Sequence, residues 1–219
     1  MGAMAAAPTE PERAHSRRGG VRARILHAGG ALFYSGGVRA VSADKVIAAA
    51  GVSKVTFYRH FPTKDDLVVA YLEAVAERER ALLDELRRAH AGDPDAALAA
   101  LAAVLGELAA GPRFRGCSFV NAGAELADAD HPARAVVARH RASYAGFFAG
   151  VARGAGAPEP DAAAAELMMV RDGAMVCGDM GDATAVGPRL AGAFAAVLAA
   201  HRRAAGGPGG VTSGRTGVT

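Results

Sequence analysis

Residues 41–67 read VSADKVIAAAGVSKVTFYRHFPTKDDL, and small polar residues, a glycine and a proline divide this stretch into helices. Ser42 and Ser53 each precede a helical run, where a hydroxyl oxygen can accept a hydrogen bond from an otherwise unpaired N–H of the first turn. Gly51 suits the left-handed residue that follows a helix, and Pro62 cannot continue one. The stretch therefore predicts two short helices, one after each serine.

These two helices, over 42–50 and 54–61, are joined by the turn Gly51-Val52-Ser53. Two short helices with a glycine-containing turn of this length form a helix-turn-helix, whose second helix enters the DNA major groove. A longer helix is expected next, because Thr63 supplies an N-cap and Asp66 an acidic third residue. The pattern indicates a DNA-binding unit near the N-terminus.

The charge of the chain is concentrated around this unit. Ten lysines and arginines lie between Arg13 and Lys64 with Asp44 as the one acid, a formal charge of +9, whereas residues 65–219 carry −4. A block of this kind favours a polyanion such as double-stranded DNA. A solvated basic face is the alternative, but such a face normally carries interspersed acids.

The rest of the composition favours an all-α, soluble protein. Alanine is abundant and aromatic residues make up 5% of the chain, which favours helices over sheets. Charges interrupt each apolar run before the roughly 18 residues that a membrane span needs, and the N-terminus lacks the apolar core of a signal peptide. Cys117 and Cys177 form no CxxC pair, so a reduced, cytoplasmic protein is expected.

Helical periodicity extends over most of the chain. Glycine and proline clusters separate about nine expected segments, at 21–34, 42–50, 54–61, 64–89, 95–110, 117–127, 132–153, 160–180 and 187–204. Residues 1–18 and 205–219 have the composition of disordered tails.

The helix-turn-helix resembles the N-terminal signature of the TetR family of bacterial transcriptional regulators. The matching residues are Ala50-Gly51-Val52-Ser53, Phe57-Tyr58, His60-Phe61, Thr63-Lys64 and Asp65-Asp66-Leu67, and the similarity covers about residues 21–70. The resemblance implies a three-helix DNA-binding domain over 19–66 and a helical ligand-binding and dimerisation domain over 67–204. It also implies a homodimeric repressor that binds a palindromic operator, is released by a small-molecule effector, and needs no cofactor.

Within this resemblance, the second helix of the motif has two faces. Phe57 and Phe61 lie four residues apart and are expected in the core, while Lys54 and Arg59 can reach guanine or phosphate oxygens. His60 fits a helix cap or a packed residue as well as a phosphate ligand, and Ser42 fits a plain cap. The candidate DNA-binding residues are Ser42, Ser53, Lys54, Val55, Thr56, Tyr58, Arg59, His60 and Lys64.

The C-terminal three-quarters carry no catalytic or metal-binding motif, so no enzyme and no metal site are expected. The resemblance places a ligand cavity among the middle helices. Cys117 fits a small buried residue better than a redox site. The candidate pocket residues are Phe114, Cys117, Phe119, Asn121, Phe147, Met168, Arg171, Asp172 and Met175.

The last two helices are rich in alanine, and their larger apolar residues recur at helical spacing. The resemblance implies a four-helix dimer interface here, and packing within one chain is the alternative. The candidate interface residues are Leu167, Met175, Leu190, Phe194, Val197 and Leu198.

Two other functions remain as alternatives. One is an activator, or a regulator that uses no small molecule. The other is a small helical enzyme or lipophile-binding protein with a vestigial helix-turn-helix, against which Lys54, Arg59 and Lys64 argue. Binding to DNA discriminates between the two classes.

Overall fold

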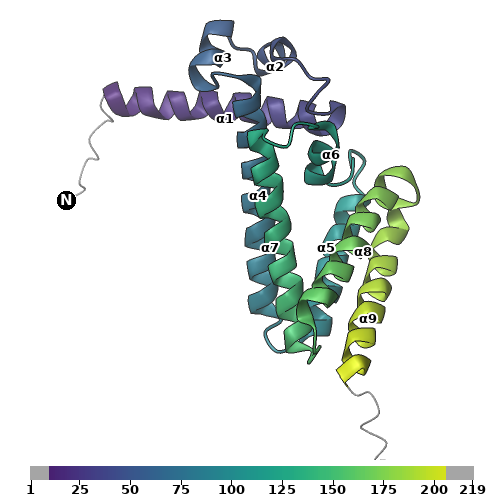
Figure 1. The fold of residues 1–219 in the computed structure, drawn as a ribbon. Helices are drawn as coiled ribbons and strands as arrows, with labels where there is room; N and C mark the ends of the chain where they lie inside the picture. Colours follow the sequence, from purple (N-terminus) through teal and green to yellow (C-terminus); the bar gives the residue numbers. More distant parts are fainter. Residues whose placement is uncertain (1–9, 206–219) are drawn as a thin grey trace, which may run out of the picture. The chain divides into compact units, whose positions relative to one another are not determined.

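The structure, a computed structural model, describes the backbone of residues 10–205 and the side chains of residues 20–203. These residues form nine α-helices and a short 3-10 helix, with no strand among them (Figure 1). The predicted all-α fold is therefore confirmed. The elements are α1 (Glu10–Gly36), α2 (Ala43–Ala50), α3 (Lys54–His60), α4 (Lys64–Ala89), α5 (Pro94–Ala109), α6 (Ser118–Glu125), α7 (Pro132–Gly154), α8 (Pro160–Met180), η1 (Ala183–Ala185) and α9 (Val186–Ala205).

Helix α1 begins earlier than the sequence pattern indicates. The expected start is Val21, but the helix starts at Glu10, so residues 10–18 of the predicted N-terminal tail are helical. The pair Gly19-Gly20 explains the difference, because glycine disfavours helix and reads as a break. The remainder of both predicted tails, 1–9 and 206–219, lies outside the described residues.

The chain divides into two compact units, and the predicted functional boundary between residues 66 and 67 stays a prediction. Unit 1 contains the described residues through Arg80 together with Arg115–His140, and unit 2 contains Ala81–Phe114 together with the described residues from Arg141 onward. Helices α4 and α7 each contribute residues to both units.

The core of unit 1 forms beneath the helix-turn-helix. Helix α2 packs against α1 and α3, and the ring of Phe33 on α1 lies 6.0 Å from that of Tyr71 on α4. Ile25 and Phe57 are both fully buried in this core. The predicted inward position of Phe57 and Phe61 is confirmed, since Phe61 is only 2% exposed.

Unit 2 is built mainly from α5, α8 and α9, with α9 packed against both other helices. The ring of Phe148 on α7 lies 5.5 Å from that of Phe194 on α9. At the η1 end of the unit, a Cβ atom built on Gly106 would lie 2.6 Å from the Cα atom of Gly187. Glycine is therefore required at position 106 for α5 to approach the start of α9 this closely.

The apolar character of α9 also satisfies a membrane-span criterion. Ala183–Arg203 has a mean hydropathy of 1.4 and is, within the described part of the chain, the one segment long and apolar enough to cross a membrane by length and composition. The core helices of soluble proteins meet the same criterion, so this finding is weak evidence for a span. The sequence pattern predicts no span, because charges such as Arg189 interrupt the apolar run. A mean hydropathy, by contrast, is averaged over all residues of a segment and tolerates a single charge.

Candidate nucleic-acid interface

Local hydrogen bonds set the ends of the two motif helices. The hydroxyl oxygen of Ser42 accepts from the backbone N–H of Lys45 at 3.3 Å, which caps α2. Gly51 ends α2 in the left-handed region with φ +61°, a conformation that glycine adopts without a Cβ penalty. The hydroxyl oxygen of Ser53 accepts from the N–H of Thr56 at 3.1 Å and caps α3. The predicted caps and glycine stop are confirmed.

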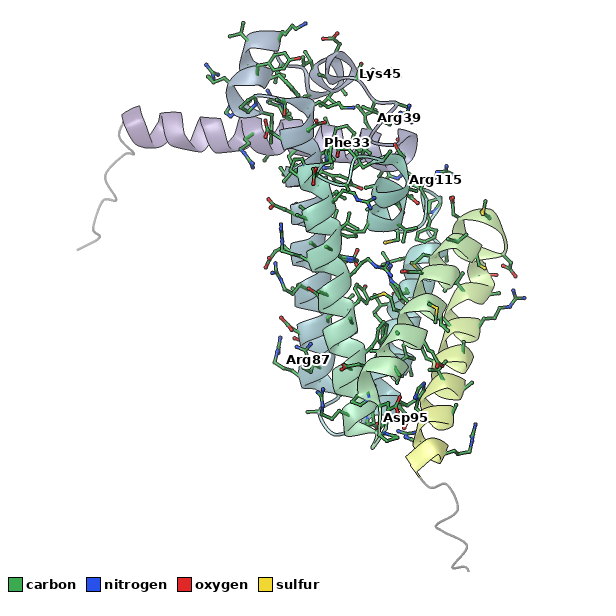
Figure 2. The ribbon with its side chains drawn as sticks, in the orientation of Figure 1. Phe33, Arg39, Lys45, Arg87, Asp95 and Arg115 are labelled. Carbon is green, nitrogen blue, oxygen red and sulfur yellow. The ribbon has the colours of Figure 1, made fainter. Side chains whose placement is uncertain are left out.

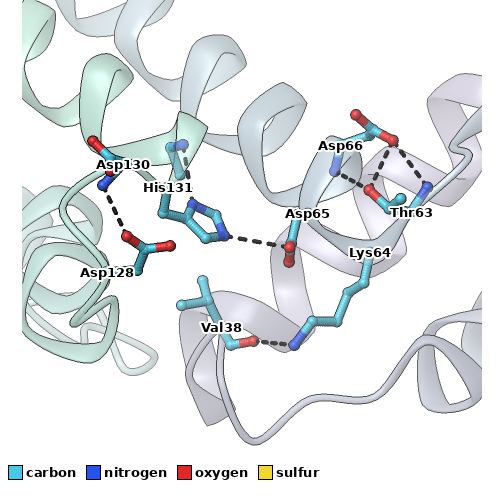
Figure 3. A network of polar contacts seen from close by, with 9 residues as sticks. Val38, Thr63, Lys64, Asp65, Asp66, Asp128, Asp130 and His131 are labelled. Atoms are coloured by element: carbon cyan, nitrogen blue, oxygen red, sulfur yellow. Dashed lines mark hydrogen bonds and ion pairs between the residues drawn. The ribbon is translucent and has the colours of Figure 1, made fainter.

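Helix α4 begins with a reciprocal cap. The N–H of Asp66 donates to the hydroxyl oxygen of Thr63 at 3.0 Å, while the carboxylate of Asp66 accepts from the N–H of Thr63 at 2.9 Å. Figure 3 shows both residues beside Lys64. This capping box satisfies two backbone donors at once and sets the path of the chain directly after α3.

Helix α3 presents one polar, basic face. Val55 is 78% and Tyr58 40% exposed, while Phe57 on the opposite face is fully buried. Of the nine candidate residues, Ser42, Ser53, Lys54, Val55, Tyr58 and Arg59 are exposed, and Thr56, His60 and Lys64 are half-buried. Packing of the opposite face thus leaves Lys54, Val55, Tyr58 and Arg59 on the accessible side.

Two of the lysines have partners within unit 1. The ammonium group of Lys54 lies 3.7 Å from the carboxylate of Asp44, and both side chains are well exposed, so the pair is weak and open to exchange. The ammonium group of Lys64 donates to the carbonyl oxygen of Val38 at 2.8 Å (Figure 3). Lysine has three donors, so this bond fixes the side chain and leaves two for another acceptor.

Arg39 and Lys45 are two further cations of unit 1 that are not among the candidates predicted from the sequence. Both side chains are exposed, and Figure 2 labels them beside α2. The sequence indicates a role in DNA binding for these two residues only through their place among the basic residues between Arg13 and Lys64, because neither lies on α3.

Helix α6 and the loop before it are tied to the same unit. The Tyr34 hydroxyl donates to the carbonyl oxygen of Gly116 at 3.0 Å and accepts from the N–H of Arg115 at 2.9 Å. At the other end of α6, the Glu125 carboxylate accepts from the N–H of Arg39 at 2.8 Å. The loop before α6 and the last residue of α6 are therefore hydrogen-bonded to the region around the end of α1.

Comparison with known proteins identifies this architecture. The family model described as "Bacterial regulatory proteins, tetR family" matches residues 25–71, from within α1 to within α4. A TetR-family transcriptional regulator from Streptomyces coelicolor is 34% identical, with 83% of this chain and 96% of that chain covered and a TM-score of 0.79. The chain belongs to the TetR family of transcriptional regulators.

Other solved structures agree with this TetR assignment. A putative TetR-type regulator from Streptomyces avermitilis is 32% identical over 81% of this chain and 97% of that chain, with a TM-score of 0.70. A TetR regulatory protein from Rhodobacter sphaeroides is 25% identical over 83% of this chain and 98% of that chain, with a TM-score of 0.69. No curated protein matches the chain.

The candidate ligand-pocket residues of this TetR-family chain fall into both units. Cys117, Phe119 and Asn121 belong to unit 1, and Phe114, Phe147, Met168, Arg171, Asp172 and Met175 belong to unit 2. In unit 1 Phe119 stacks on His140 with ring centroids 3.5 Å apart. In unit 2 the Arg171 guanidinium lies 4.5 Å from the centre of the Tyr144 ring and bonds to Asp172 at 3.1 Å.

A small cavity in unit 1 includes one of these candidates. Asn121 lines it together with residues of α1, α4 and α6, among them Tyr34, Tyr71 and Glu125. Its volume of about 10 Å³ is near the minimum for one water molecule. No group of three or more His, Cys, Asp or Glu side chains in the described part of the chain could hold a metal ion.

The candidate dimer-interface residues are mostly buried within a single chain, and their place in an interface stays a prediction. Leu167, Met175, Leu190, Phe194 and Leu198 are each at most 3% exposed within a single chain, and Val197 is half-buried. Helical spacing identifies the buried stripe of a helix but not what covers it, and here α5 packs against α9. Burial within a single chain accounts for their spacing without a second copy.

Proposed function

We propose that this TetR-family regulator is a repressor that binds a palindromic operator as a homodimer and is released by a small-molecule effector. The main support for this proposal is that α3 has one buried apolar face and one exposed basic face. Phe57 is fully buried, and Lys54 and Arg59 are exposed on the accessible side. A short, capped helix with this division fits a major groove while its neighbours hold it in place.

The candidate residues divide by the part of the DNA they can recognise. Lys54 and Arg59 have donors for guanine O6 and N7 or for phosphate, and Thr56 offers a methyl group and a hydroxyl to base edges. Tyr58, His60 and Lys64 fit contacts to the sugar–phosphate backbone, which set register without reading sequence. The whole proposed set is Ser42, Ser53, Lys54, Val55, Thr56, Tyr58, Arg59, His60 and Lys64.

For the dimer, we propose the outer faces of α8 and α9. Met169 is 65%, Val176 45% and Met180 82% exposed, and their spacing of seven and four residues places them on one stripe of α8. Helix α9 adds exposed alanines and a glycine, at 192, 195, 196 and 200. An exposed apolar face of this kind marks an interaction site, and a two-fold partner matches a palindromic operator.

For release by an effector, the hydrogen bonds of α6 supply a route to the helix-turn-helix. An effector acts only through a difference in its affinity for the DNA-bound and released states. Because Tyr34 bonds to the loop before α6 and Glu125 at the end of α6 bonds to Arg39, a displacement of α6 changes the contacts that support the helix-turn-helix. We propose that the effector binds among the candidate pocket residues. We also propose that the protein, as a regulator acting on chromosomal DNA, lies in the cytoplasm.

The test begins by selecting genomic DNA fragments that the purified protein retains. On a selected site, affinity should fall roughly 10³- to 10⁵-fold between 50 and 200 mM salt, the behaviour of about 6–10 phosphate contacts. Lys54→Ala should weaken specific binding by about 1–3 kcal/mol, while Arg87→Ala on α4 serves as the matched control.

Two further measurements separate repression from its alternatives. Deleting the gene should raise expression of a reporter placed behind the selected site, and compounds handled by the neighbouring gene products should lower operator affinity. Failure to retain any genomic fragment would refute the DNA-binding function, and a fall in reporter expression would identify an activator.

A further inference from the structure

One peptide group of unit 1 lies between two opposite charges. It joins Val38 to Arg39 in the loop between α1 and α2. Its N–H donates to the Glu125 carboxylate at 2.8 Å, and its carbonyl oxygen accepts from the Lys64 ammonium group at 2.8 Å (Figure 3). Because Glu125 is the last residue of α6 and Lys64 the first residue of α4, a single peptide group connects these two helices.

The two charges strengthen the hydrogen bonds on both sides of this peptide. A peptide group is a dipole of about 3.5 D, and here its positive N–H end faces an anion while its negative C=O end faces a cation. Hydrogen bonds to ionised groups are stronger than neutral ones, and bonds in a chain polarise one another. Both charged side chains are half-buried, which limits screening by salt. Loss of either charge should therefore weaken the hydrogen bond that the other makes.

A glycine makes room for the carboxylate beside the loop. Gly37 has φ +85°, and a Cβ atom built on it would lie 2.6 Å from Oε1 of Glu125. A side chain at this position would push the carboxylate away from the Arg39 N–H. The close approach to Gly37 therefore keeps Glu125 within hydrogen-bond distance of the peptide.

Helix α4 does not need a lysine as its first residue. The positive end of a helix dipole disfavours a cation, and Thr63 and Asp66 already cap α4. The Lys64 ammonium group is instead bonded to the loop, which continues through the exposed Arg39 to Ser42, the cap of α2. Lys64 and this loop thus border the surface proposed to face DNA.

We propose that Glu125 is a positioning residue for DNA binding, which acts through the Val38–Arg39 peptide to hold Lys64 and the loop in the geometry that phosphate contacts require. The inference rests on the proposed function, because it presupposes that Lys64 contacts DNA. A group that is held in its bound geometry before binding loses less entropy on binding.

The sign of the effect separates positioning from plain electrostatics. An acid near DNA repels phosphate, so its removal by charge alone should raise affinity. If Glu125 positions Lys64, its removal should instead lower affinity, although the protein becomes more positive.

The test measures operator affinity of the full-length variants Glu125→Gln and Glu125→Ala. The glutamine oxygen can still accept from the Arg39 N–H, so this variant removes the charge and retains a hydrogen bond, whereas alanine removes both. On an operator selected from genomic DNA, Glu125→Ala should lower affinity about tenfold, the equivalent of about 1.4 kcal/mol, and Glu125→Gln by a smaller factor. In a Lys64→Ala background, neither change should lower affinity further.

Asp130→Asn is the matched control, because it removes one negative charge at an exposed position five residues after Glu125. Its operator affinity should not fall below that of the wild type.

A second measurement follows the peptide itself and needs no DNA. In the NMR spectrum of the free protein, Lys64→Ala should move the amide proton resonance of Arg39 upfield. Lys64 contacts the carbonyl oxygen of this peptide and not its N–H, so a shift of the N–H resonance reports polarisation through the peptide.

Four outcomes overturn the inference in different ways. Wild-type binding with equal or higher affinity in both Glu125 variants refutes the positioning role alone and leaves the proposed function intact. An equal loss with and without Lys64 shows that Glu125 acts independently of that lysine. An unmoved Arg39 resonance refutes the coupling through the peptide. Absence of wild-type binding to any DNA refutes the proposed function, and the positioning role with it.

Discussion

The helix pair α2–α3 and the helix pair α8–α9 are encoded in different ways. Helix α2 has 8 residues and α3 has 7, and a serine hydroxyl caps each of them. Helix α8 has 21 residues and no side-chain cap at its start, and its buried positions include Ala163, Ala164 and Leu167. Short helices depend on local capping, whereas long ones depend on packing of a face.

The two pairs also expose opposite kinds of surface. The accessible face of α3 carries cations, and the accessible face of α8 carries methionine and valine. A cationic face suits a polyanion, while an apolar face suits a second apolar surface. Of the four predictions below, the first two test the faces of α8 and α3 and the last two test one contact inside each unit, beginning with the largest expected effect.

The α8 face is tested by placing charge on it. Met169→Arg/Val176→Arg should convert the proposed dimer to a monomer, measured by light scattering. Loss of simultaneous binding to two half-sites should reduce operator affinity by about 10²–10⁴-fold. Both side chains are exposed in one chain, so the thermal stability of the monomer should remain.

Leu108→Arg is the control for this variant, because Leu108 is 56% exposed on α5, outside the proposed interface. It should leave mass and affinity unchanged. A double variant that is still a dimer would place the interface away from the exposed α8 stripe.

The buried face of α3 is tested by Phe57→Ala. Phe57 is fully buried, and removal of a large core side chain should cost about 3–5 kcal/mol, measured by denaturant unfolding. Val55→Ala, at a position that is 78% exposed, should change stability by less than about 0.5 kcal/mol. Equal effects of the two changes would contradict the assignment of the helix faces.

The contact of α4 with α6 is tested by Tyr71→Phe. The Tyr71 hydroxyl donates to the hydroxyl oxygen of Ser118 at 2.8 Å, and its loss should cost about 1 kcal/mol. Burial raises the pKa of Tyr71 above its ordinary value. The folded protein therefore holds this proton more tightly than the unfolded chain does, and stability should fall as the pH rises above about 10.

Unfolding of wild type and variant between pH 8 and pH 11 measures this alkaline contribution. Tyr71→Phe should remove it and flatten the dependence. An unchanged alkaline slope in the variant would assign the titration to another group.

The smallest effect is expected in unit 2, at the ion pair between Asp95 and Arg202. Its two hydrogen bonds, of 2.7 and 3.0 Å, join the start of α5 to the end of α9. The Arg202 hydrogen bond lowers the pKa of Asp95, so the stabilisation is present above the ordinary aspartate pKa and is lost as the pH falls below about 4.

The Asp95 carboxylate is more than half exposed, which limits the contribution to under about 1 kcal/mol. Asp95→Asn should therefore reduce the fall in stability between pH 5 and pH 3, measured by urea unfolding. Identical acid profiles for variant and wild type would show that the pair contributes nothing.

The helix ends of the motif could be predicted from the sequence, because they depend on contacts between neighbouring residues. Ser42, Gly51 and Ser53 define the motif helices through bonds and dihedral angles that involve a few neighbouring residues. The start of α1 could not be predicted in this way, because Gly19-Gly20 disfavours a helix that the structure nevertheless contains.

Long-range packing explains the other differences. The apolar spacing of Phe194 and Leu198 is a valid sign of burial, but it does not reveal that α5 lies against α9. Arg39 is likewise separated by 86 residues from the Glu125 carboxylate that its backbone N–H contacts. Pairings at such separations depend on the folded topology, which periodicity does not specify.

The division of the chain has a consequence for modular engineering. Unit 1 is discontinuous, since Arg115–His140 fold with the helix-turn-helix although 34 intervening residues belong to unit 2. A chimeric regulator that joins the helix-turn-helix domain at residue 66 to the ligand-binding domain of another protein would lack the segment that is hydrogen-bonded to Tyr34 and Arg39. Transplanting residues through Arg80 together with Arg115–His140 would instead carry the domain with its own support, so the transferable cassette is a discontinuous one.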